Sequence, residues 1–317
     1  MPNGVVLAVD ENVSCTVREK KHFATVKVEW EEGLPMNIID GQHRVEGLKL
    51  LIKDGFAEFN DFELPVCVLV DLHFYMQAEI FAIINGKQTK VPRSRIYDLL
   101  GYRPIKDPIL REKAYRGEMA IHRFCHQAVR VLNTSRKSPW FDRIKMRGSG
   151  PGIVTQGAMV DHLARLVVPR KDSARVSSFP VLYPFFKGSD LVGLAKTCVV
   201  YYLGIAEAWP EKWKDDKALK ASLFGKTNGV AVMFMVLHDL ILFAGGAERL
   251  KFEQVRDFWR KAPPERIDSP PPGGSRGYQL EWYRAIMEKA AGTDYRENLT
   301  KAASEFRPRL RESGALF

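Results

Sequence analysis

The sequence is poor in cysteine, and this scarcity limits the kinds of protein it can encode. Only four cysteines occur among 317 residues, they lie far apart and no two form a CxxC pair: Cys15, Cys67, Cys125 and Cys198. A disulfide framework or a zinc site built from cysteines is therefore not expected, and a reducing, cytoplasmic compartment fits the composition.

Patterns for export and membrane insertion are also lacking. The first residues, MPNG, carry neither the basic region nor the apolar run of a signal peptide. The most apolar stretch, residues 229–246, is interrupted by His238 and Asp239. This predicts a buried core helix and no membrane partner.

Positive charge is abundant, and its distribution is uneven. The net charge is +10, and the window from Lys87 to Arg147 alone holds 16 lysines and arginines against 5 acidic residues. The rest of the chain is therefore close to neutral. Charge clustered in this way suits a surface that binds a polyanion such as DNA, although a solvated helical face would have the same composition.

The first hundred residues alternate between strand and helix patterns. Strands are predicted at residues 5–9, 23–30, 36–39 and 64–70, the last as an unbroken apolar run that is buried on both faces. Helices are predicted at residues 45–53 and 75–84, the second ending at the turn pair Asn85-Gly86. Residues 1–105 are thus expected to form a mixed α/β (α+β) unit.

Later residues change to a helical pattern. Residues 106–262 predict a helical region that contains most of the basic window, with helices near 114–133, 156–168, 191–208, 229–243 and 252–261. Residues 263–317 are interpreted as a linker rich in Pro and Gly, a helix at 279–291 and a basic tail.

The turn Asp40-Gly41-Gln42-His43-Arg44 is the strongest candidate site. It lies between an apolar strand and an apolar helix, where the first N–H groups of the helix and its dipole favour an anion. Gly41 allows a close approach, and Arg44 can bind a phosphate through its fork of donors. His43 can transfer a proton near neutral pH. Asp40 is a candidate to cap the helix, to orient its neighbours or to hold a divalent metal.

Two motifs resemble the DGQHR-domain family, which includes the DndB proteins of bacterial DNA phosphorothioation and related modification and defence systems. The first is the turn itself, in IIDGQHRVEGL. The second is Phe81-x-x-x-Asn85-x-x-Gln88, which is followed by VPRSRIYDLL. More distantly, Gly41 and Arg44 match the GxxR phosphate box of ParB and sulfiredoxin-like folds, although the acidic second position of that box is Gln42 here.

The resemblance implies a ParB/sulfiredoxin-like unit, which in other members begins with a longer N-terminal segment. It implies a phosphate or nucleotide site, with ATP or another NTP and Mg²⁺ as the candidate ligands. The residues it assigns to that site are Gly41, Gln42, Arg44, Asn85 and Gln88. The densest positive charge overlaps the second motif, and this predicts DNA contacts at Lys87, Lys90, Arg93 and Arg95.

Three functions are compatible with these expectations. The first is a DNA-associated protein that acts with partner proteins of a DNA-modification cluster. The second is a metal-dependent NTPase or DNA-backbone nuclease that uses Asp40 and His43 as catalytic residues and Asp40 as a metal ligand. The third is a transcriptional regulator without chemistry.

Overall fold

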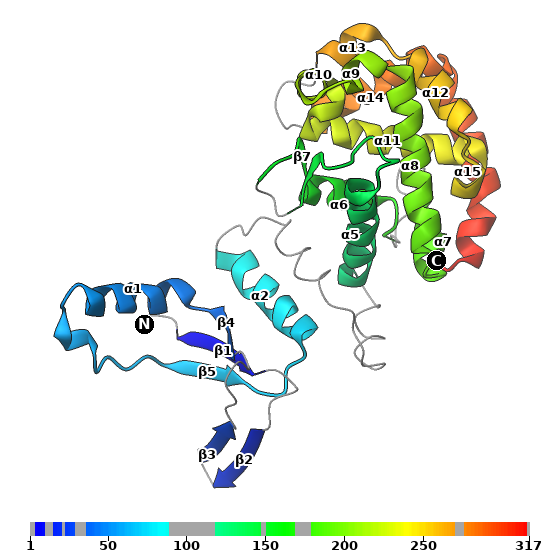
Figure 1. The fold of residues 1–317 in the computed structure, drawn as a ribbon. Helices are drawn as coiled ribbons and strands as arrows, with labels where there is room; N and C mark the ends of the chain where they lie inside the picture. The colour runs from blue at the N-terminus through cyan, green and yellow to red at the C-terminus, as the bar shows by residue number, and fades with distance from the viewer. Residues whose placement is uncertain are drawn as a thin grey trace. The chain divides into compact units, whose positions relative to one another are not determined.

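A computed structural model describes residues 4–9, 15–20, 23–28, 36–88, 118–146, 150–168, 179–269 and 276–315. These residues form two compact units, one from the first 88 residues and one from residue 118 onward. The first contains a small mixed sheet and the second is mostly helical (Figure 1). The expected α/β class is therefore confirmed in this general form.

The sheet of the first unit is centred on its earliest strand. Strand β1 (Val5–Val9) pairs antiparallel with β4 (Met36–Asp40) and parallel with β5 (Val66–Leu69). A separate hairpin joins β2 (Cys15–Lys20) to β3 (Phe23–Val28). The central position of β1 explains why Val5, Ala8 and Val9 are buried.

Strand β5 does not occupy the buried position that its apolar sequence predicts. It is one of the two edge strands of the three, and Val66 and Val68 are 48% and 41% exposed. The prediction that it is buried on both faces is wrong for the structure as described. Its apolar, β-forming residues favour a strand, but the fold of the whole chain determines which strands lie beside it and so how deeply it is buried.

Two helices accompany the sheet. Helix α1 (Gln42–Lys53) follows β4 directly, and the 3-10 turn η1 (Ala57–Phe59) comes after it. Helix α2 (Phe74–Gln88) continues through Asn85 and Gly86, so the predicted end at this pair is wrong. A helical glycine costs only about 1 kcal/mol, which the surrounding turns can offset.

A buried amide connects α2 to the sheet. Gln77 is 2% exposed, and its Oε1 accepts a hydrogen bond of 2.8 Å from Nδ2 of Asn37 on β4. Its Nε2 donates to the carbonyl of Leu72 at 2.7 Å. The side-chain amide is thereby satisfied at both ends, which fixes the first turns of α2 against the strand that leads into the candidate turn.

The second unit is a stack of helices with one short strand pair, β6 (Ile144–Lys145) and β7 (Val154–Thr155). Each helix predicted for this region has a counterpart, and most ends shift by a few residues, while the predicted start at residue 114 lies outside the described residues. The helices are α5 (Glu118–Thr134), α6 (Gln156–Arg165), α8 (Leu191–Ala208), α11 (Thr227–Ala244), α12 (Phe252–Arg260) and α14 (Arg276–Ala291). The shorter helices between them are α7 (Tyr183–Lys187), α9 (Pro210–Trp213), α10 (Asp216–Ala221), η3 (Leu223–Gly225), η4 (Ala247–Arg249) and α13 (Pro264–Asp268).

Aromatic side chains fill the core of the helical unit. Trp140, Tyr202 and Trp259 are fully buried, and their rings meet neighbouring rings edge to face. The centroids of Trp140 and Trp213 are 5.0 Å apart at 80°. Such contacts add stabilisation beyond the area they bury, and through Trp213 and Phe224 they hold the short elements α9 and η3 in the core.

Helices α8 and α11 are each long and apolar enough to cross a membrane by length and composition alone. Most of α11 is buried within the helical unit, as a core helix requires. These two helices do not decide between a membrane and a cytoplasmic location, so the cytoplasmic location stays a prediction.

The C-terminal segment is more structured than its composition suggests. The interpreted linker contains α13, whose Ile267 is fully buried, while residues 270–275 lie outside the described ranges. The interpreted basic tail is a helix, α15 (Tyr295–Glu312). Residues 276–315 belong to the same compact unit as residues 118–269. The charged surface of α15 and its internal Pro308 hide the helical pattern in the sequence.

Arginines of α15 take part in this packing. Arg309 donates to the carbonyl of Gly245, where α11 ends, and to Glu248. Arg307 lies over the ring of Phe179, 5.3 Å from its centroid. A cation is favoured at a helix C-terminus, so Arg309 stabilises the end of the core helix as well as the docking of α15.

Candidate functional site

The DGQHR turn connects the end of β4 to the start of α1. Asp40 ends the strand, Gly41 takes the left-handed conformation with φ 96° and ψ 8°, and the helix begins at Gln42. A Cβ on Gly41 would lie 3.0 Å from Cγ2 and 3.2 Å from Cα of Val5 on the central strand. Glycine is therefore required both by the conformation and by the close approach to β1.

We expect Gly41→Ala to destabilise the sheet unit by about 1–3 kcal/mol, because the left-handed conformation is strained for alanine and the backbone of Val5 leaves little room. Urea denaturation followed by circular dichroism measures the change. Gly47→Ala on α1 is the matched control, since no atom lies within 4 Å of its Cβ position. Equal stability of the two variants would contradict the required role of Gly41.

Arg44 is held by two acceptors at this turn. One guanidinium nitrogen, Nη2, contacts Oδ2 of Asp40 at 2.8 Å, and the other, Nη1, donates to the carbonyl of Gly4 at 3.0 Å. The side chain remains 31% exposed. The sequence gives no sign of Gly4 as a partner, because its contact uses a backbone carbonyl forty positions away.

Asp40 does not cap the helix, which corrects one of its three predicted roles. Gly41 occupies the N-cap position, and no side chain caps α1. The carboxylate instead orients Arg44 across one helical turn, as the second predicted role requires. Among the residues that the structure describes, no group of three or more His, Cys, Asp or Glu side chains could hold a metal ion, and the metal role of Asp40 stays a prediction.

Gln42 and His43 form the exposed first turn of α1. Both side chains are exposed, and the N–H groups at the start of a helix have no partner within the helix. The N–H groups of Arg44 and Val45 both donate to the carbonyl of Gly41, at 3.0 Å and 3.1 Å. The turn therefore combines free backbone donors, a positive helix end and an anchored guanidinium, which suits an anion.

The second motif is only partly described. Asn85, Lys87 and Gln88 lie in the last turns of α2, but nothing can be said of their side chains. Lys90, Arg93 and Arg95 lie outside the described residues. Whether these side chains join the DGQHR turn stays a prediction.

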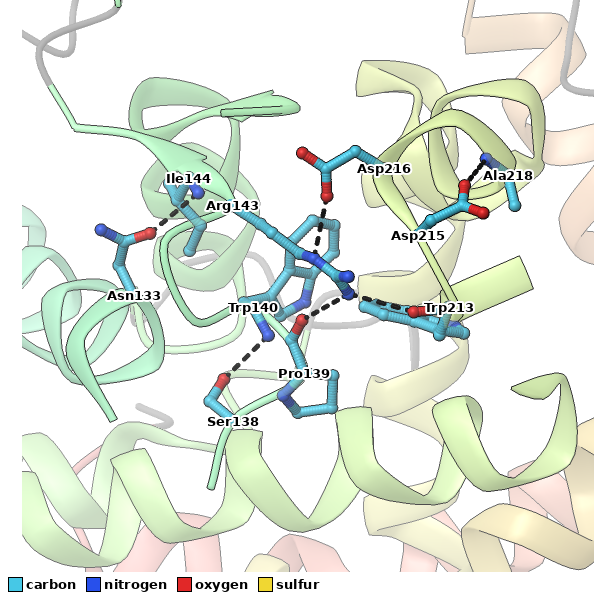
Figure 2. A network of polar contacts seen from close by, with 10 residues as sticks. All are labelled: Asn133, Ser138, Pro139, Trp140, Arg143, Ile144, Trp213, Asp215, Asp216 and Ala218. Atoms are coloured by element: carbon cyan, nitrogen blue, oxygen red, sulfur yellow. Dashed lines mark hydrogen bonds and ion pairs between the residues drawn. The ribbon is translucent and has the colours of Figure 1, made fainter. Parts of the chain in front are cut away.

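Part of the basic window serves the fold of the helical unit. Arg123 is 3% exposed. Figure 2 shows Arg143 with its Nε 3.1 Å from the carboxylate of Asp216. Its Nη1 donates to the carbonyls of Pro139 and Trp213 at 3.2 Å and 3.3 Å. Arg143 thus joins the loop before β6 to α9 and α10, and the charge of the window overstates the charge available to a ligand.

The described residues thus comprise a small mixed sheet unit, which holds the strand–turn–helix candidate site, and a helical unit. No protein-family model, no curated protein and no solved structure matches the chain.

Proposed function

We propose that the protein associates with DNA and binds a phosphate group at the DGQHR turn. In this proposal it is a DGQHR-domain protein with a ParB/sulfiredoxin-like unit, and it serves a bacterial DNA-modification or defence system. The ligand is either a nucleotide, with ATP and Mg²⁺ as candidates, or a phosphate of the DNA backbone. Both present the same phosphate oxygens to Arg44, and the experiment below distinguishes them.

The anchoring of Arg44 is the observation that supports this proposal best. A guanidinium has five N–H donors in a fixed plane. The contacts with Asp40 and Gly4 use two of them and hold the group at the start of α1, with 31% of the side chain exposed. A phosphate could bind to the remaining donors and to the free N–H groups of the helix without first ordering a mobile side chain.

The state of Asp40 favours binding over catalysis. Its carboxylate is paired with Arg44 and its side chain is 16% exposed. A metal-dependent NTPase or nuclease would need this carboxylate as a metal ligand, and the metal would then compete with Arg44 for it. The pairing therefore favours a DNA-bound regulator or accessory protein over the enzyme.

We expect Arg44→Ala to reduce phosphate-ligand binding at least tenfold, because it removes a charge-assisted fork at a helix N-terminus. Calorimetry with ATP, CTP and inorganic phosphate tests for a free ligand, and a 20-base-pair duplex tests for the DNA backbone. Arg44→Lys should recover only part of the affinity, since lysine keeps the charge but loses the planar fork.

Lys49→Ala is the matched control, because Lys49 lies on the same helix, is 66% exposed and pairs only with Glu46 in the described structure. It should bind as the wild type does. Binding of every ligand by Arg44→Ala at wild-type affinity would refute the phosphate site. Loss of duplex binding alone would identify the DNA backbone as the ligand.

A further inference from the structure

The segment between α8 and α11 concentrates lysine on the helical unit, far along the sequence from the basic window. Residues 212–226 contain five lysines. Lys214, Lys217 and Lys220, which we call the α10 lysines, are exposed, and so is Lys226 at the start of α11. A solvated surface could carry the same number of lysines. The interpretation therefore depends on whether the nearby carboxylates pair with these lysines or with other residues.

The carboxylates of this segment are committed to contacts within the unit. Asp215 caps α10, its Oδ1 accepting the N–H of Ala218 at 2.7 Å, and Asp216 pairs with Arg143 (Figure 2). Asp268 of α13 pairs with Lys212. The described structure therefore uses Lys212 and the acidic residues for folding, while none of the α10 lysines forms an ion pair with a described residue.

The α10 lysines lie near one another. Lys217 and Lys220 are three positions apart in one helix and so share a face. Asp215 lies close to Lys214 and Lys217: the Ala218 amide lowers the pKa of its carboxyl most, and the charges of these two lysines lower it further. The three lysines thus lie on or next to α10, where Asp215 offsets part of their charge and Asp216 is paired with Arg143.

A groove lies beside this turn. It has a volume of about 250 Å³ between α9, α10 and α13. It is lined by the small residues Ala218, Ala221 and Ser222 and by charged residues of both signs, Lys212 and Lys214 with Glu211 and Asp268. Lys212 pairs with Asp268, and the small residues leave room beside Lys214 for part of an extended chain, while Glu211 adds negative charge there.

We propose that the α10 lysines and the adjoining groove bind the phosphate backbone of duplex DNA, as a second contact region separate from the DGQHR turn. The inference takes its DNA partner from the proposed function, but it uses residues of the other unit and does not require Arg44. Phosphate contacts of this kind are independent of base sequence and release counterions. A duplex that contacts both regions would bind more tightly than either region alone would allow.

The test is a salt titration of duplex binding by the full chain. The variant K214E/K217E/K220E should weaken binding to unrelated sequences alike. It should also lower the slope of log affinity against log salt by up to roughly 2.7, since each phosphate contact contributes about 0.9. The matched control is K196E/K289E/K301E, which reverses three exposed lysines on α8, α14 and α15 and makes the same change in net charge. It should leave the slope near the wild-type value.

A wild-type slope for K214E/K217E/K220E, or an equal loss in both variants, would overturn the inference. The inference would also be overturned if poly-glutamate competed for the protein as well as duplex DNA does and this competition required the α10 lysines. That result would indicate an acidic protein as the partner. The K214Q/K217Q/K220Q variant removes the three charges without reversing them, and its thermal transition shows whether it is folded. A folded glutamine variant with weakened duplex binding excludes misfolding as the cause. If the α10 variant reduces the slope while Arg44→Ala binds the duplex, ATP, CTP and inorganic phosphate as the wild type does, the phosphate site of the turn is refuted and this inference stands.

Discussion

Asp239→Ala is expected to destabilise the helical unit by about 3 kcal/mol and to lower its melting temperature by several degrees. Asp239 is 2% exposed on α11, and its Oδ1 lies 2.7 Å from Nδ1 of His238. The hydroxyl of Tyr283 on α14 donates to its Oδ2. Burial and then the charge of Asp239 raise the pKa of Tyr283, which therefore remains a donor at any pH at which the protein folds. Without Asp239, two buried polar groups lose their partner.

Thermal and urea denaturation followed by circular dichroism would measure this loss. Tyr283→Phe removes only one of the two contacts and should have a smaller effect. Asp257→Ala is the control: this aspartate is exposed on α12 and pairs with Arg256 on the surface, so its removal should leave the transition unchanged. An Asp239→Ala protein as stable as the Asp257→Ala protein would show that the buried contacts contribute nothing net.

Stability of the helical unit is expected to fall as the pH drops from about 6.5 towards 4. Burial, helped by the charges of Arg130 and Arg123, lowers the pKa of His126 from 6.5 to about 4. Burial and then Arg165 lower the pKa of His162 to about 4, with Asp161 opposing. In this range the unfolded chain binds protons that the folded unit does not, so acid favours unfolding. Each histidine contributes up to about 3 kcal/mol, which is fully present above pH 6.5.

Urea denaturation at pH 7.5, 6.0 and 5.0 would test this expectation. The double variant His126→Gln, His162→Gln should lose less stability between pH 7.5 and 5.0 than the wild type does. His43→Gln removes a histidine that is exposed in the sheet unit, and it should keep the wild-type dependence. A double variant that loses stability as steeply as the wild type would place the acid sensitivity in other groups.

The sequence predicts local structure well where a short-range pattern determines it. Helix α8 has the predicted bounds, and a strand leads through the glycine turn into a helix as predicted, with α1 beginning at Gln42, before the predicted start at Val45. The edge position of β5 was not predictable in this way, because pairing partners are chosen by the whole chain. Helix α15 was missed because Pro308 and many charged residues interrupt its pattern, although its buried Ala303, Phe306 and Leu310 lie at helical spacing.

The candidate site shows the same limit. The identity of the turn and the pairing of Asp40 with Arg44 follow from residues four positions apart. The Gly4 carbonyl, by contrast, reaches Arg44 only because β1 and β4 are neighbours in the sheet. The partners of Arg143 on α9 and α10 are likewise long-range, so the sequence could not separate this folding arginine from cations available to a ligand.

The position of β1 at the centre of the sheet has a consequence for synthesis on the ribosome. This strand emerges before its two neighbours, β4 and β5, and the second of these ends at Leu69. Both edges of β1 therefore stay open until later segments leave the exit tunnel, and contacts of such long sequence separation form slowly. The Gly4 carbonyl reaches Arg44 only once β1 has paired with β4, so the nascent chain cannot complete its candidate anion site before that pairing forms.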